Sequence, residues 1–279
     1  MINYFKKSLA RKRARRITQE YPPTISQVDL SQDGPIEFAN WSNPLVKPFV
    51  LTQPMVDFFK KFIKEGDMAI DIGANIGDTT VPMALAAGKS GITLGFDPNP
   101  YVFKILEANA ALNKDKTNIV PLRYAISKDE DEFYFISSEA SFGNGGISPT
   151  KESIHGKFVA PEKIKGIDLT QLLQKEYASR VDKLSFIKID TEGYDKEIIK
   201  SIRTLIQKYK PTLVAESFGA SPDEAKMELY EVIRRDDYQI FYFEDFDINT
   251  KTKELINKEE ITHWKDTINI YAVSKQLNR

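Results

Sequence analysis

The sequence contains no cysteine and only two histidines among its 279 residues. The absence of cysteine excludes disulfide bonds, thiolate-bound metals, iron–sulfur clusters and cysteine nucleophiles. It agrees with a reducing compartment, so we expect a cytoplasmic protein. A lone histidine is more often an ordinary surface residue than a catalyst, and His155 and His263 are therefore weak candidates for catalysis.

A long apolar run is also missing. No stretch approaches the roughly 18 consecutive apolar residues that a membrane-spanning helix needs. Apolar residues make up 41% of the chain and charged residues 28%, a balance typical of a globular protein with a sizeable core. The length fits one large domain or one domain with an appendage, and no internal repeat is visible.

Acidic residues are absent from the first 19 positions, which carry seven Lys or Arg. Because this segment contributes +7 and the whole chain is −1, the remainder carries −8. We predict that residues 1–19 form a basic tail, either solvated or acting as a surface anchor. Apolar residues among the cations, including Phe5 and Leu9, suit peripheral contact with an anionic membrane. An organellar transit peptide has a similar composition, and nucleic acid is disfavoured because the remainder lacks a positive field.

After the basic segment, the chain has two further segments with different sequence patterns. Residues 20–66 contain six prolines and little periodicity, apart from apolar residues at helical spacing over 56–63. We predict an irregular proline-rich arm and a helix that pack on the core. From 67 to 279, short apolar strands alternate with helices of about ten or more residues. This order predicts an α/β fold with a Rossmann-like, doubly wound, mostly parallel sheet.

The strands of this sheet are expected at 68–72, 91–96, 118–123, 184–190 and 212–217, followed by 238–243 and 267–273. The helices are expected at 76–87, 101–113, 194–209 and 222–235. No helical pattern separates the last two strands, so we predict an antiparallel pair with one antiparallel strand at the sheet edge. An exposed strand over 132–136 precedes residues 137–160, which are rich in Gly, Ser and Asn. We predict a flexible loop here, either one that binds and closes over a substrate or a disordered connector.

A glycine-rich turn, Asp71 to Gly77, follows the first strand. Open α/β sheets bind ligands beyond the carboxyl ends of their strands, and glycines at 73 and 77 let the backbone approach a ligand. The next helix presents N–H groups there, and Thr79 can cap it or supply a hydroxyl. The spacing D-x-G-x-x-x-G differs from the dinucleotide pattern G-x-G-x-x-G, and Asp71 suits a sulfonium and an ammonium group better than a pyrophosphate. The turn favours a methyl-donor site over a NAD-dependent oxidoreductase or a purely structural turn.

Asp97 closes the second predicted strand, 20 positions after Gly77. A carboxylate at this place can accept hydrogen bonds from both hydroxyls of a ribose. The glycine turn and Asp97 together predict S-adenosylmethionine as the cofactor.

Three segments resemble the FkbM-type S-adenosylmethionine-dependent methyltransferases: residues 69–77 (AIDIGANIG), 96–100 (FDPNP) and 187–193 (IKIDTEG). The family more often has glutamate where this chain has Asp97. The resemblance spans roughly residues 51–243 and leaves out the basic tail and the proline-rich arm. It implies methyl transfer, usually to an oxygen of a sugar, a glycan or a natural product.

The resemblance also implies roles for single residues. The methionine half of the cofactor would lie among residues of the glycine turn, the ribose at Asp97, and the adenine near the residues just past the third strand. The implied cofactor-binding residues are Asp71, Gly73, Asn75, Gly77, Thr79, Asp97, Pro98, Ala125 and Ile126. Asp190 and Glu192 would border the transferred methyl group and the acceptor.

Methyl transfer to a hydroxyl needs alignment of the reactants and removal of the acceptor's proton. Asp190 or Glu192 is the favoured base, with Glu216 and His155 as alternatives; Asp190 could instead only orient the cofactor, and Glu192 could only cap a helix. The same carboxylates could hold Mg²⁺, but a metal is not favoured. A non-enzymatic alternative is a Rossmann-like module that binds a membrane or nucleic acid through the basic tail.

Overall fold

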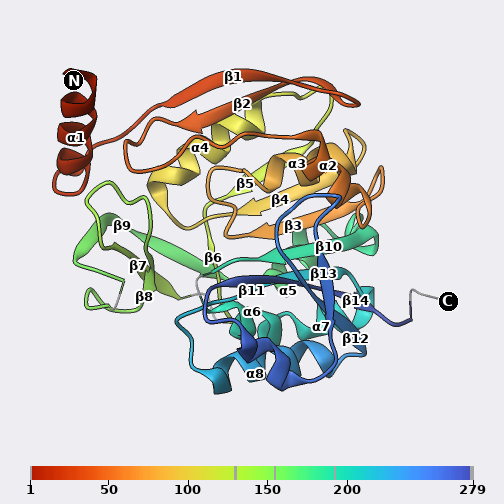
Figure 1. Ribbon diagram of the computed structural model, residues 1–279. Coiled ribbons are helices and arrows are strands. Elements are labelled where there is room, and N and C mark those ends of the chain that lie inside the picture. The colour runs from red at the N-terminus through yellow and green to blue at the C-terminus, as the bar shows by residue number, and fades with distance from the viewer. Residues whose placement is uncertain (1, 129–130, 154, 192, 277–279) are drawn as a thin grey trace.

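An eight-stranded mixed sheet forms the centre of the computed structural model, which describes residues 2–128, 131–153, 155–191 and 193–276 (Figure 1). The strand order is β13-β12-β14-β11-β10-β3-β4-β5. Five neighbouring strands run parallel: β3 (Met68–Ile72), β4 (Ile92–Phe96), β5 (Ile119–Leu122), β10 (Leu184–Ile189) and β11 (Thr212–Ser217). The expected Rossmann-like, mostly parallel α/β sheet is confirmed.

The antiparallel part of the sheet is larger than a single edge strand. β14 (Ile268–Ser274) lies between β11 and β12 (Tyr238–Phe243) and is antiparallel to both. β13 (Thr252–Leu255) then pairs antiparallel with β12 at the sheet edge. The expected antiparallel pairing of the last two strands is therefore present, but its reversed strand lies inside the sheet.

The proline-rich arm is not irregular, and that prediction is wrong. β1 (Pro23–Leu30) and β2 (Gly34–Trp41) form an antiparallel hairpin. Gly34 follows the turn with a φ of 72°, in the left-handed region that favours glycine. The hairpin covers α4 (Pro100–Ala111), and Ile36, Phe38 and Trp41 are buried there.

A smaller four-stranded sheet, in the order β6-β9-β7-β8, lies beside the main sheet. Its strands are β6 (Ala125–Ile126), β7 (Glu132–Ser137), β8 (Gly146–Ser148) and β9 (Phe158–Ile167). The segment 137–160 therefore contains β8 and the start of β9 and is not a loop throughout. Phe135, Phe142 and Ile164 form a small hydrophobic cluster against this sheet.

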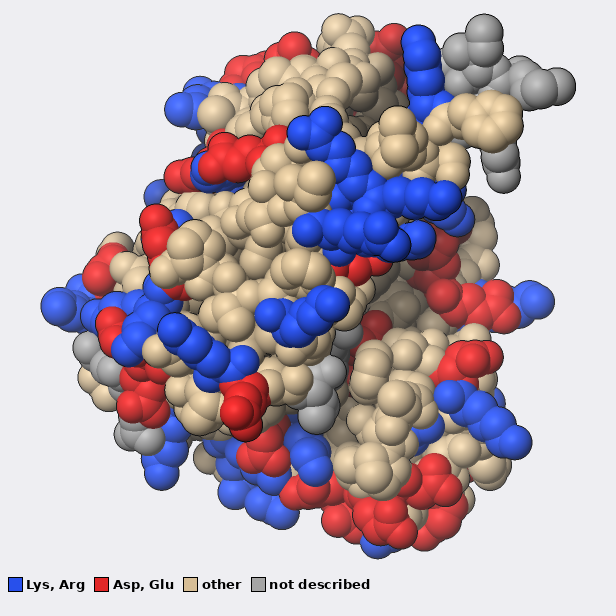
Figure 2. All heavy atoms as spheres, turned by 90° about the vertical axis from the view of Figure 1, so that its left-hand side faces the viewer, with Lys and Arg blue, Asp and Glu red and all other residues tan. Residues whose placement is uncertain are grey.

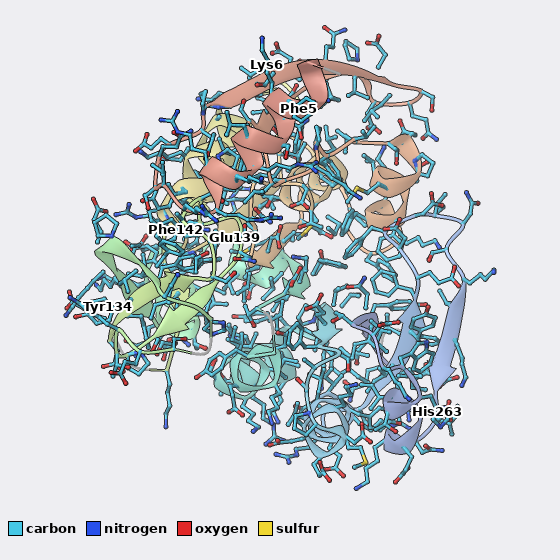
Figure 3. The ribbon with its side chains drawn as sticks, turned by 60° about the vertical axis from the view of Figure 1, so that its left-hand side comes forward. Phe5, Lys6, Tyr134, Glu139, Phe142 and His263 are labelled. Carbon is cyan, nitrogen blue, oxygen red and sulfur yellow. The ribbon has the colours of Figure 1, made fainter. Side chains whose placement is uncertain are left out.

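Helix α1 (Ile2–Ala14) contains most of the basic segment and stands at one side of the molecule (Figure 1). Figure 2 shows Lys and Arg side chains gathered over it. Phe5 and Lys6 lie on α1, and Glu139 and Phe142 lie near its C-terminal end (Figure 3). Among the described residues, no helix is both long enough and apolar enough to span a membrane.

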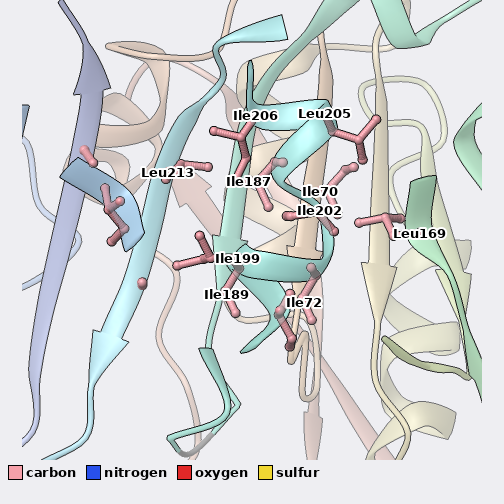
Figure 4. Packing of buried hydrophobic residues seen from close by; sticks show 14 of the residues in the cluster. Ile70, Ile72, Leu169, Ile187, Ile189, Ile199, Ile202, Leu205, Ile206 and Leu213 are labelled. Carbon is pink, nitrogen blue, oxygen red and sulfur yellow. The ribbon is translucent and has the colours of Figure 1, made fainter. Parts of the chain in front are cut away.

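Helices cover both faces of the main sheet, and the central strands are therefore buried on both faces. Along β3, Ile70 and Ile72 face one hydrophobic cluster, whereas Ala69 belongs to the cluster on the other face. On the first face lie α5 (Leu169–Glu176), α6 (Asp195–Ser201), α7 (Arg203–Tyr209) and α8 (Asp223–Arg234), with the 3₁₀ turns η1 (Val181–Lys183) and η2 (Lys258–His263). Figure 4 shows how Ile199, Ile202 and Leu205 pack against the strands on this face. On the second lie α2 (Gln53–Lys60), α3 (Thr80–Ala87) and α4. The single helix expected over 194–209 is divided between α6 and α7.

Asn109 joins the hairpin to the core, and replacing it should destabilise the protein. Its buried side chain accepts from Ala39 N at 2.8 Å and donates to Ala39 O at 2.9 Å and Ile76 O at 2.7 Å. Asn109→Ala leaves these buried backbone groups without partners, so we expect a loss of about 3 kcal/mol in the free energy of unfolding. Urea denaturation measures this loss.

Asn113 provides a matched control one turn further along. Its half-buried side chain forms solvent-exposed hydrogen bonds with the backbone N–H and carbonyl of Glu37, at 2.9 and 2.8 Å. Asn113→Gly keeps the left-handed backbone (φ 52°) and should cost less than about 1 kcal/mol, because water replaces the lost bonds. Equal losses for the two variants would show that Asn109 does not anchor the hairpin.

Candidate functional site

A cavity of about 660 Å³ lies at the carboxyl ends of the central parallel strands. This volume is within the range of small-molecule sites, roughly 300–1,000 Å³. The ends of β3, β4, β10 and β11 contribute to it through Gly73, Asp97, Asp190 and Glu216, respectively. The cavity is thus at the edge where open α/β sheets bind their ligands.

At Gly73 the glycine turn passes very close to the backbone of Asp190, at the end of β10. The φ of this glycine is 81°, and a Cβ at this position would lie 1.9 Å from the backbone oxygen of Asp190. The N–H groups of Gly73 and Ala74 both donate to Phe96 O at 2.9 Å, which fixes the turn against β4. Position 73 therefore requires glycine, and its bare backbone forms part of the cavity wall.

Asn75 and Gly77 belong to the same turn but differ in their position relative to the cavity. Asn75 has a φ of 47° and lines the cavity. A Cβ on Gly77 would lie 3.2 Å from Leu106 Cδ1, so this glycine allows the turn to pack against α4. Gly77 is not among the described residues that line the cavity.

Asp71 is fully buried behind the cavity wall. One carboxylate oxygen accepts from the hydroxyls of Thr79 and Thr80, each at 2.7 Å, and the other is 3.2 Å from Lys188 Nζ. Asp71 and Lys188 are register partners on the adjacent strands β3 and β10. The carboxylate thus holds α3 and Lys188 in place, and it can reach a ligand only through them.

Lys188 is a buried cation among carboxylates. Its Nζ lies 3.2 Å from Asp71 Oδ1 and 3.3 Å from Asp190 Oδ2, and it donates to Gly73 O at 3.3 Å. Burial lowers the pKa of Lys188, but the carboxylates of Asp71, Asp190 and Asp78 outweigh burial and raise it. Lys188 is therefore charged and fixed. Sequence reasoning missed this residue, although a lysine within an apolar strand (Phe186 to Ile189) is a detectable signal.

Asp97 lies where the second strand ends, as expected. Its two oxygens accept from Asn75 N at 2.7 Å and Asn99 N at 2.8 Å. Burial raises the pKa of Asp97 to about 7, against the lowering effect of these two N–H donors. The carboxylate is thus held in a fixed orientation at the cavity wall and titrates close to neutral pH.

Apolar side chains line the cavity beside Asp97. They include Pro98, Ala125 and Ile126, for which the family resemblance implies cofactor contacts, together with Tyr124 and Phe135. The segment Gly143 to Ile147 forms the facing wall. Asn99 fixes this wall by donating from Nδ2 to Phe142 O at 2.7 Å. The arrangement places apolar side chains next to a hydrogen-bond acceptor, the carboxylate of Asp97.

The other end of the cavity carries polar groups suited to a second ligand. Asp190 lies here with 42% of its side chain exposed. Thr191, Tyr194, Glu216, Asp245, Thr267 and Asn269 also line this end. Glu192, the other proposed base, lies outside the described residues. Neither histidine is among the described lining residues.

Asp195 shapes this end from behind and was not predicted. Its buried carboxylate accepts from Thr191 Oγ1 at 2.8 Å and from Glu216 N at 2.9 Å. Burial raises the pKa of Asp195 to about 6. The residue links the turn after β10 to the end of β11, and no local sequence signal reveals a contact that spans 21 positions.

The described cavity wall is strongly acidic. Its carboxylates are Asp78, Asp97, Asp190, Glu216 and Asp245, and its one cation among the described residues is the internally paired Lys188. Burial raises the pKa of Asp78 to about 6. In the part of the chain that the structure describes, no three His, Asp or Glu residues are grouped so as to hold a metal ion. The donor set and the glycine cradle fit a cationic ligand such as S-adenosylmethionine.

Comparisons with known proteins find a matching family model and a relative of known activity. The model of the methyltransferase FkbM domain matches residues 71–246, more than half of the chain. The hexuronic acid methyltransferase AglP of Haloferax volcanii is 26% identical over 179 residues, which cover 64% of this chain and 68% of that protein.

Matches among solved structures include two methyltransferases. A precorrin-6y C5,15-methyltransferase from Geobacter metallireducens has a TM-score of 0.43 and 11% identity, with 82% of this chain and 93% of that chain covered. An S-adenosylmethionine-dependent O-methyltransferase from Thermotoga maritima has a TM-score of 0.41 and 11% identity, with 91% and 78% covered.

Proposed function

Because the chain belongs to the FkbM methyltransferase family and is an S-adenosylmethionine-dependent methyltransferase, we propose that it methylates a hydroxyl oxygen of a neutral sugar. The acceptor would be a glycan or a related natural product. Family membership places the chain among methyltransferases and not among the nicotinamide oxidoreductases that the sequence left open. The observation that carries the proposal is the acidic cavity.

The carbohydrate part of this proposal is supported by the relative from Haloferax volcanii, a hexuronic acid methyltransferase. The charge of the cavity favours a different sugar class here. Its described lining has five carboxylates, and its one cation, Lys188, already pairs with Asp71 and Asp190. A sugar carboxylate would meet like charges without a counter-ion, whereas a neutral hydroxyl could donate to a carboxylate.

The cavity residues support distinct tasks. The bound cofactor supplies a methyl group on a positively charged sulfur. Asp97 would accept from the ribose hydroxyls, and Ala125 and Ile126 would contact the adenine. The carboxylate of Asp190 would orient the acceptor hydroxyl and accept its proton, while Lys188 holds that carboxylate in place at 3.3 Å. The protein thus contributes alignment and proton removal.

A paired acceptor assay tests the proposal. Two oligosaccharides that differ only in one hexose or hexuronate unit are incubated with the protein and isotopically labelled S-adenosylmethionine, and mass spectrometry locates the label. We expect a base-stable methyl ether on the neutral sugar. A base-labile methyl ester on the hexuronate would show that the enzyme selects the acid and would contradict the proposal.

The titration of Asp97 predicts a pH dependence of cofactor binding. An ionised carboxylate accepts from both ribose hydroxyls, so binding favours the deprotonated form. Because burial raises the pKa of Asp97 to about 7, the affinity for S-adenosylhomocysteine should fall by up to about tenfold for each pH unit below 7. Isothermal titration calorimetry between pH 5 and 8 measures this dependence.

Asp97→Asn provides the control for this dependence. The amide of the variant cannot ionise. At pH 8, where wild-type Asp97 is ionised, the variant should bind S-adenosylhomocysteine about ten- to a hundredfold more weakly, because it lacks the charge-assisted hydrogen bond. Its affinity should vary little with pH. A wild-type affinity that is constant from pH 5 to 8 would exclude Asp97 as the ribose ligand.

A further inference from the structure

Helix α1 has a charge and apolar pattern that the methyltransfer site does not use. Exposed cations cover it and the turn that follows: Lys6, Lys7, Arg11, Lys12, Arg13, Arg15 and Arg16. The same helix exposes 64% of Phe5 and 69% of Leu9. These two residues are four apart and lie on one face of the helix. Large apolar side chains surrounded by cations are typical of helices that lie in a membrane interface.

The attachment of α1 to the body leaves this face outward. Ala14, the one buried residue among the described side chains of the helix, is nine positions after Phe5. At 3.6 residues per turn, this spacing places Phe5 on roughly the opposite side of the helix from Ala14. Arg11 also holds the helix to the body by donating to Pro44 O at 3.2 Å. Phe5 and Leu9 therefore point away from the protein.

The helix lies close to the wall of the cavity. Ala140 N donates to Arg15 O at 3.3 Å, and the side chains of Arg15 and Glu139 form an ion pair at 3.6 Å. The next residues along the chain include Phe142 and then Gly143, which lines the cavity. Figure 2 shows a hollow in the surface on the same face, below the Lys and Arg side chains over α1, and Figure 3 shows Glu139 beside the helix.

We propose that α1 docks the protein on an anionic membrane surface and holds the cavity close to it, so that the acceptor sugar is carried by a membrane lipid or polymer. The cations of α1 match anionic lipid headgroups, and Phe5 and Leu9 enter the interface between headgroups and acyl chains. The remainder of the chain carries −8, which repels the same surface and restricts contact to α1. Nucleic acid would use the cations but not the two apolar side chains.

Vesicle binding by the full chain tests this docking. The probes are vesicles of phosphatidylcholine alone and of phosphatidylcholine with an equal amount of phosphatidylglycerol, and a single-stranded RNA of mixed sequence. We expect binding to the anionic vesicles only. Changing Lys6, Lys7 and Lys12 together to Gln should lower the partition coefficient by about a hundredfold. Phe5→Ser with Leu9→Ser should lower it by about tenfold.

A matched control removes the same charge elsewhere. Lys89, Lys114 and Lys175 are exposed lysines outside α1, and their joint change to Gln should leave vesicle binding unchanged. Equal loss in both triple variants, or no binding to anionic vesicles, would overturn the proposal. RNA binding that depends on the lysines but not on Phe5 and Leu9 would also overturn it.

That the acceptor is a carbohydrate rests on the proposed function. Measurements on the same variants test the membrane docking and the methyltransfer site separately. Calorimetry with S-adenosylhomocysteine on the same variants reports the methyltransfer site alone. Normal cofactor binding without vesicle binding would refute the docking and leave the function intact. Vesicle binding without cofactor binding would refute the site and leave the docking intact.

Discussion

Replacing Asp190 by asparagine is expected to lower kcat by about 10²–10⁴-fold, the usual contribution of a general base. The carboxylate lies at the end of β10 and faces the cavity with 42% of its side chain exposed. One oxygen is 3.3 Å from Lys188 Nζ, which leaves the other oxygen for an acceptor hydroxyl. An amide has nearly the same shape but cannot take up the proton. Single-turnover kinetics with a methylated sugar as product measure the effect.

The interpretation depends on the affinity for S-adenosylhomocysteine, which should stay close to the wild-type value in Asp190→Asn. A variant that loses cofactor affinity together with kcat would indicate that Asp190 orients the cofactor instead. Glu192→Gln is the parallel variant for the second proposed base. If both variants keep full turnover, base catalysis at the end of this strand is excluded.

The sequence predicts the parallel core well because its signals are local. β3, β4 and β10 are short apolar runs, and a strand buried on both faces needs such a run whatever lies beside it. Asp97 and Asp190 each follow one of these runs directly. The carboxyl ends of parallel strands meet at one edge, so the position of both carboxylates could be predicted without knowledge of any contact.

The sequence does not predict the hairpin of β1 and β2, because its prolines indicate irregular structure. Pro23 begins β1, and Pro35 is the second residue of β2. In a sheet of two strands, both strands are edges, where a missing N–H is tolerated. In the sequence, Ile36 and Phe38 are separated by the polar Glu37. This apolar–polar pattern predicts a strand only if the two prolines are not taken to exclude one.

The pairing of Lys188 with Asp71 could not be predicted, because it depends on the register of two strands that are far apart in the sequence. Asp71 is 117 positions away from Lys188, and the two meet because β3 and β10 pair with these residues side by side. Reversal of a strand order or a shift by one residue would separate them. This pairing makes Asp71 the buried counter-ion of a lysine, a contact that its position in the glycine turn does not reveal.

Lys188→Met should lower the free energy of unfolding by about 3–5 kcal/mol, because it leaves the buried charge of Asp71 without its counter-ion. The carboxylates raise the pKa of Lys188 more than burial lowers it. The charged form therefore stabilises the fold fully below the pKa of an unfolded lysine, about 10.4. This contribution is lost only as the pH rises through the raised folded-state pKa, so urea denaturation at pH 7 measures all of it.

The loss of the ion pair between Lys188 and Asp71, and not the loss of packing, should account for most of this decrease in the free energy of unfolding. Asp71→Asn removes the buried charge while its amide oxygen can still accept from Thr79 and Thr80. The double variant should therefore be more stable than the sum of the single changes by about 2 kcal/mol or more. Lys226→Met is the matched control, because Lys226 is buried but donates to a carbonyl, Trp264 O, at 3.1 Å. It should cost only about 1 kcal/mol, and additive single changes at 71 and 188 would show that the two strands are not joined by this pair.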